Sequence, residues 1–124
     1  MGYDLNFWAY ADESLPRSPD DHLAVYQALC DGGRPDGLRD LPVLGVRSRL
    51  EALLADWKKL DADHFERDGG AAIEALIEPF WARFDLYGDW TGDDANQLIG
   101  LMKPYGCPLF DPQADSKGVR FTLD

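Results

Sequence analysis

The sequence is poor in the residues that build disulfide-bonded, metal-bound or membrane-embedded structures. It has two cysteines and two histidines among 124 residues, and no apolar run approaches the ~18 residues of a membrane span. Cys30 and Cys107 stand far apart without a C-x-x-C partner, which favours reduced thiols over a disulfide. Because the first residues also lack a signal-peptide pattern, the sequence predicts a soluble cytoplasmic protein.

Catalytic and cofactor motifs are missing as well. The sequence contains no nucleophile elbow, no dinucleotide-binding glycine pattern and no phosphate-binding loop. His64 follows Asp61 and Asp63, but no second histidine stands one helical turn away, and three ligands from one short loop seldom close a metal site. We therefore expect no catalytic residues, no metal and no cofactor.

Basic residues are few, with 12 lysines and arginines against 23 aspartates and glutamates, so the net charge is −11. Residues 61–94 hold ten of the acids and two of the bases, and residues 1–31 hold six acids and one base. A field of this sign repels nucleic acid and anionic membranes, and it attracts a basic protein. Solubility alone is the other explanation of the charge.

Alternating apolar and polar residues predict four strands in one domain that spans residues 1–124. Residues 3–9 and 80–87 alternate most clearly, and residues 119–123 form the last strand. Residues 71–78 are ambiguous, because their alanine, glutamate and leucine favour a helix. The alternation of this segment, with Leu76 as its one misfit, favours the strand that we expect.

Three amphipathic helices are expected between the strands. Capping signatures mark two helix starts, at residues 18–21 (SPDD) and 91–94 (TGDD), and another helix begins near Pro42. The helices would cover the sheet face that holds Leu5 and Phe84 and leave the other face open. The predicted fold class is α+β, with two layers and a largely antiparallel four-stranded sheet with about three helices packed on one face.

The expected open face and the loop after residues 80–87 combine acids with tryptophans. Acidic side chains steer a basic partner, and exposed aromatic side chains anchor it. The predicted partner-binding residues are Asp4, Trp8, Asp85, Asp89, Trp90 and Asp93.

Three blocks of sequence resemble a family of small bacterial proteins. They are residues 3–8 (YDLNFW), residues 83–88 (RFDLYG) and residues 106–113 (GCPLFDPQ), of which the last is the most specific. Some members are similar to immunity proteins encoded beside secreted polymorphic toxins of the Rhs or contact-dependent kind. The family pattern supplies no catalytic residues, and residues 71–78 are richer in alanine and glutamate than the corresponding family strand.

The resemblance implies an intracellular immunity protein that binds a cognate toxin domain and occludes its active cleft. The toxin would be a basic nuclease or nucleotide-using enzyme, and the chain itself a monomer or weak dimer. One alternative is an acidic structural or regulatory domain with no toxin partner. Another is a small enzyme in which Asp85 and either Asp93 or Asp94 act as acid and base.

Overall fold

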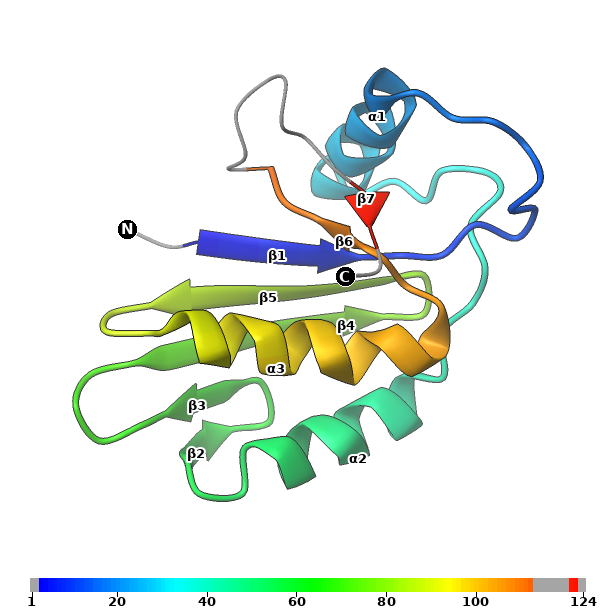
Figure 1. The fold of residues 1–124 in the computed structure, drawn as a ribbon. Coiled ribbons are helices and arrows are strands. Elements are labelled where there is room, and N and C mark those ends of the chain that lie inside the picture. Colours follow the sequence, from blue (N-terminus) through cyan, green and yellow to red (C-terminus); the bar gives the residue numbers. More distant parts are fainter. Residues whose placement is uncertain (1–2, 113–120, 123–124) are drawn as a thin grey trace.

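The computed structural model describes residues 3–112 and 121–122, in which helices pack on an antiparallel sheet (Figure 1). Helices in this part of the chain are α1 (Pro19–Cys30), α2 (Val43–Leu53), α3 (Gly92–Met102) and the 3₁₀-helix η1 (Lys103–Tyr105). Its strands are β1 (Tyr3–Phe7), β2 (Lys58–Asp61), β3 (His64–Glu66), β4 (Ala72–Glu78), β5 (Trp81–Tyr87), β6 (Leu109–Phe110) and β7 (Phe121–Thr122).

These strands form one antiparallel sheet with the order β2-β3-β4-β5-β1-β6-β7. The α+β class is confirmed, but the expected four strands are too few. The sequence pattern misses β2 because all four of its residues are exposed and carry no alternation, and β6 has only two residues. Val119, Arg120 and Leu123 of the last expected strand lie outside the described residues.

The centre of the sheet is made by β1, β4 and β5. Phe84 of β5 lies opposite Leu5 of β1 on one side and Ala75 of β4 on the other. Residues 71–78 are therefore confirmed as a strand. Leu76 does not fit the alternation of β4 because it lies on the opposite face from Ile73, where it is 41% exposed.

Local sequence sets the starts of two helices. Ser18 and Asp21 form a reciprocal capping box at α1, and Thr91 and Asp94 form another at α3. In each box the hydroxyl oxygen accepts a hydrogen bond from the aspartate N–H at 3.2 Å, and the carboxylate accepts one from the cap N–H at 2.8 Å. Both predicted capping signatures are confirmed, since capping requires only residues within one turn.

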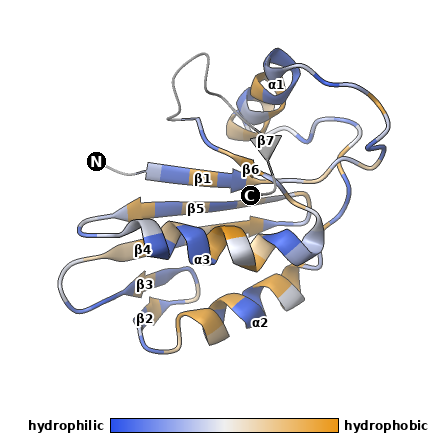
Figure 2. Ribbon diagram, in the orientation of Figure 1, coloured by the Kyte–Doolittle hydropathy of each residue, from blue (hydrophilic) through white to orange (hydrophobic). Residues whose placement is uncertain are grey.

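The main core lies between the sheet and helices α2 and α3, which lie side by side on one face (Figure 1). Bands of hydrophobic and hydrophilic residues alternate along both helices (Figure 2). The rings of Phe7 and Phe84 meet edge to face in this core, with centroids 5.9 Å apart. Val46 and Leu50 of α2 and Leu98 of α3 are fully buried over the same sheet face.

The expectation that all three helices share one face is wrong, because α1 packs on the opposite face. Leu29 of α1 is buried there together with Trp8, Trp81 and Phe110. The rings of Trp8 and Phe110 lie 5.1 Å apart, and neither side chain is exposed. Trp8 thus lies on the predicted face of the sheet, but a helix covers that part of the face.

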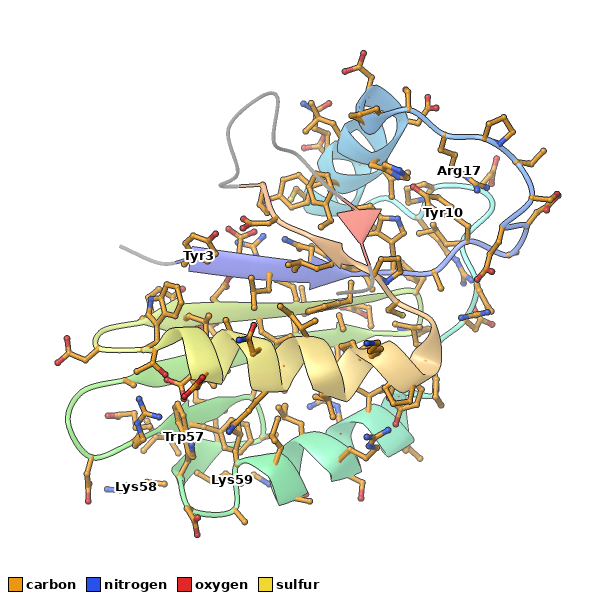
Figure 3. All side chains as sticks on the ribbon, viewed as in Figure 1. Tyr3, Tyr10, Arg17, Trp57, Lys58 and Lys59 are labelled. Carbon is orange, nitrogen blue, oxygen red and sulfur yellow. The ribbon has the colours of Figure 1, made fainter. Side chains whose placement is uncertain are left out.

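Polar contacts hold α1 in this position. Tyr10, just after β1, has its hydroxyl oxygen 2.8 Å from Nδ1 of His22 in α1. The guanidinium of Arg17 lies 3.6 Å from the centroid of the Tyr10 ring, and both residues lie far from Tyr3 at the start of β1 (Figure 3). These contacts connect the end of β1 to the first turn of α1, which fixes the helix over β1 and β6.

Candidate functional site

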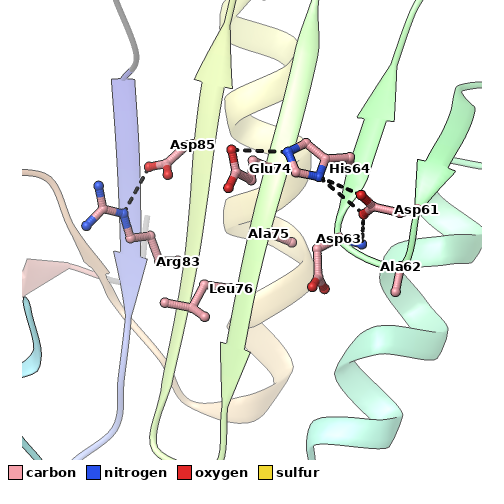
Figure 4. A pocket seen from close by; sticks show the side chains of 9 residues that line it. All are labelled: Asp61, Ala62, Asp63, His64, Glu74, Ala75, Leu76, Arg83 and Asp85. Atoms are coloured by element: carbon pink, nitrogen blue, oxygen red, sulfur yellow. Dashed lines mark hydrogen bonds and ion pairs between the residues drawn. The ribbon is translucent and has the colours of Figure 1, made fainter. Parts of the chain in front are cut away.

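The candidate site is the part of the second sheet face that α1 does not cover. In Figure 4, α2 and α3 lie behind the strands, while the side chains of the site project from the front. We call this surface the open face and define it by Asp61, His64, Glu74, Leu76, Glu78, Arg83 and Asp85. Strand register brings these residues together, since Glu74 lies opposite both His64 and Asp85, and Leu76 lies opposite Arg83.

Two hollows make the open face concave. One has a volume of about 480 Å³ and lies between the β2–β3 turn and β5 (Figure 4). The other has a volume of about 500 Å³ and lies between β4, β5 and the end of α1, where it reaches Cys30 and Phe80. Leu76 and Arg83 line both hollows, so the two hollows adjoin at these side chains on β4 and β5.

One side of the open face is an ordered cluster around Arg83. Asp4 of β1 and Asp85 of β5 lie directly opposite each other in register. Arg83 Nε donates a hydrogen bond to Asp85 at 2.9 Å, and its Nη2 lies 3.8 Å from an oxygen of Asp4. The hydroxyl of Tyr26 on α1 also donates to Asp4 at 3.1 Å. This network holds two carboxylates beside each other and fixes the guanidinium between them.

Burial and hydrogen bonding shift the pKa values in this cluster. Burial raises the pKa of Asp85, although the hydrogen bond from Arg83 acts in the opposite direction. Burial also raises the pKa of the Tyr26 hydroxyl, and the neighbouring Asp4 adds to that shift. The carboxylates lose some hydration here, which strengthens their interaction with any cation that reaches them.

On the other side of the open face, His64 lies between two carboxylates. Its Nδ1 is 3.1 Å from Asp61, and its Nε2 is 3.2 Å from Glu74. The hydrogen bond with Asp61 raises the pKa of His64, and the charge of Glu74 contributes to the same shift. Asp63, in the same hollow, pairs with Arg47 at 2.6 Å. Glu74 and Asp61 are therefore compensated by an imidazole whose charge changes with pH.

The six predicted partner-binding residues do not form one surface. Asp4 and Asp85 meet at the open face, whereas Trp8 is fully buried beneath α1. The alternation of residues 3–9 places Trp8 on the correct face of the sheet, but it contains no information about which helix covers that face. The expected exposure of Trp8 is therefore wrong. Trp8 thus has no surface to offer to a partner.

The other three predicted residues lie in the connection between β5 and α3. Trp90 is partly buried against the main core, and its ring lies 5.1 Å from that of Tyr3. The sequence alone leaves an exposed Trp90 and one folded back onto the core equally open, and the structure places the residue partly buried against the core. Asp89 and Asp93 are exposed, but Asp93 belongs to α3, which covers the face opposite to the open face.

The structure does not bring together the carboxylates considered for acid–base chemistry. Asp94 accepts hydrogen bonds from Arg67 at 2.6 and 2.9 Å and caps α3 through Thr91. Burial tends to raise the pKa of Asp94, but the bonds from Arg67 and Thr91 outweigh it and lower that pKa. Asp94 is thus a structural carboxylate at the start of α3, and Asp85 pairs with Arg83 instead.

Sequence reasoning missed His64, Glu74 and Leu76 as members of a binding surface. The residues of the β2–β3 hairpin, which carries His64, show no strand alternation, so the sequence does not predict that this hairpin lies beside β4. Leu76 did leave a signal, because it is the apolar residue that interrupts the alternation of residues 71–78. An apolar residue on the polar side of a strand becomes informative only where it lies in a hollow with other lining side chains, as Leu76 does here.

Within residues 3–112 and 121–122, no group of three or more histidine, cysteine, aspartate or glutamate side chains is arranged to hold a metal ion. None of the helices in these ranges has the length and apolar character to cross a membrane. Comparisons of the chain with models of protein families, with curated proteins and with solved structures found no match. The geometry and charge of the open face are therefore what the functional proposal rests on.

Proposed function

We propose that this chain is an immunity protein that binds a basic toxin domain through the open face and blocks its active cleft. The observation that carries the proposal is the part of this sheet face that none of the described helices covers, which is hollowed, rich in carboxylates and contains an exposed leucine. A solvated face of an antiparallel sheet is usually polar throughout, so an exposed leucine in the centre of this hollowed face supports contact with a protein partner.

The charge of the open face indicates which kind of partner it binds. The two hollows are lined by five carboxylates, one guanidinium and one imidazole: Asp61, Asp63, Glu74, Glu78, Asp85, Arg83 and His64. Together with the net charge of −11, this surface speeds the approach of a basic domain and repels an acidic one. Toxins that act on nucleic acid or nucleotides have basic clefts because their substrates are anionic, so such a cleft complements the open face.

Leu76 supplies the apolar centre that a stable complex requires. It is 41% exposed and lines both hollows. Charged side chains predominate in the first hollow, whereas Leu29, Phe80 and Trp81 contribute apolar surface to the second. Interfaces obtain most of their affinity from a few desolvated apolar contacts inside a polar rim. We therefore expect substitution of Leu76 to speed dissociation, and neutralisation of the carboxylates around it to slow association.

The test is a growth assay in which the toxin domain encoded by the neighbouring gene is expressed together with this protein. The unmodified protein is expected to restore growth, and Leu76→Asp is expected to fail. Leu44→Asp is the matched control, because Leu44 is an exposed leucine on α2 at the other face of the molecule, with 83% exposure.

Two outcomes would contradict the proposal. Absence of a toxin gene beside this one, or failure of the unmodified protein to protect, would exclude the immunity role. Full protection by a folded Leu76→Asp variant would show that the open face is not the interface. Circular dichroism of both aspartate variants separates loss of binding from loss of fold.

A further inference from the structure

The open face corresponds to a missing helix in the layer formed by α1. Among the described residues, one sheet face carries the two helices α2 and α3, whereas the other carries α1, which packs over β1, β6 and Trp81 of β5. Beyond α1, the hollows of this second face are lined by β3, β4 and the Arg83–Asp85 part of β5. A sheet face is covered either by helices or by a second sheet. Because α1 already forms a helical layer on this face, a helix of the partner is the element that continues that layer.

The exposed side chains of β4 form a row that matches a helix in length. Glu74, Leu76 and Glu78 are alternate residues of this strand and lie on the open face. Alternate residues of a strand are about 6.8 Å apart, so the two carboxylates flank the leucine over about 14 Å. On a helix, residues four apart are about 6 Å apart along the axis, so three such residues extend over about 12 Å.

We propose that the open face binds an amphipathic helix of the partner that runs along β4, with an apolar residue on Leu76 and a lysine or arginine one turn to each side. This inference rests on the proposed function and specifies the element of the toxin that is recognised. The two basic side chains meet Glu74 and Glu78, and Asp61 and Asp85 lie close enough to the first hollow to add to the negative field there.

Charge repulsion argues against a symmetric pairing of two open faces as the way in which this surface is covered. Two open faces brought together would place carboxylates against carboxylates in a protein with a net charge of −11. Like charges at an interface weaken association strongly, whereas a basic helix removes that repulsion. The pattern sought in the partner is therefore a basic residue, an apolar residue and a basic residue at successive turns of one helix.

The test uses three synthetic alanine-rich helical peptides of about 15 residues and the isotope-labelled protein, observed by NMR. The first peptide has a central leucine with a lysine one turn before it and one turn after it. The second has glutamate in place of both lysines, and the third has the same composition as the first with the lysines moved to the opposite side of the helix. Peptide affinities and the shifted backbone amides are measured for each.

We expect the first peptide to bind about tenfold more tightly than the other two, and to shift amides of β3, β4 and β5. Leu76→Asp should weaken its binding about tenfold, and Leu44→Asp should leave it unchanged. Equal binding of the first and third peptides, or shifts confined to α2 and α3, would overturn the helix inference. If Leu76→Asp still abolishes toxin protection in that event, the proposed function remains and only the helical recognition fails.

Discussion

Because α1 covers only part of one sheet face, three alanine substitutions are expected to reduce the free energy of unfolding by different amounts. Trp8 and Phe84 lie on opposite faces and are each fully buried, whereas Leu76 shares the face of Trp8 and is 41% exposed. A buried aromatic side chain removes about 150–250 Å² from water, which at about 25 cal/mol per Å² is worth about 4–6 kcal/mol as an upper estimate. Trp8→Ala and Phe84→Ala should therefore each reduce the free energy of unfolding by about 3–5 kcal/mol.

Leu76→Ala should cost less than about 1 kcal/mol, because its side chain remains in contact with water in the folded protein. The measurement is urea unfolding followed by far-UV circular dichroism, since the fluorescence signal itself changes when Trp8 is removed. Small domains have about 5–15 kcal/mol of stability, so Trp8→Phe and Phe84→Leu serve where an alanine variant lacks a folded baseline. A loss at Trp8 as small as that at Leu76 would refute the packing of α1 on this face.

Two further predictions concern titration and reactivity of single groups. The pKa of Asp94 is lowered in the fold, so its contribution to stability is complete above the ordinary carboxyl pKa and is lost as the pH falls through the lowered value. The free energies of unfolding of the unmodified protein and of Asp94→Asn, measured in urea, should therefore differ at neutral pH and become equal in acid. A difference between them that stays constant with pH would contradict this. Cys30 is exposed and Cys107 is buried, where burial raises the pKa of its thiol to about 11. Ellman's reagent should therefore label Cys30 in the native protein and Cys107 only after unfolding, and equal rates would show that the site of Cys107 opens readily.

Much of the local structure follows from the sequence because short-range physics determines it. Both capping boxes are complete within four residues, so their hydroxyl and carboxyl groups predict where α1 and α3 begin. Period-two alternation likewise places Leu5 and Phe84 on one face and Trp8 on the other, since successive side chains of a strand must point in opposite directions. The α+β class follows from these elements together.

The candidate site depended on tertiary structure. Whether a sheet face is covered depends on where a helix packs, and the apolar stripe of α1 fits either face equally well from its own sequence. Contacts of Tyr10 with His22 and Arg17 place α1 over Trp8, and this leaves Leu76 uncovered. The sequence by itself determined which side chains share a face of each strand, whereas only packing between distant segments decided which part of that face remains open to a partner.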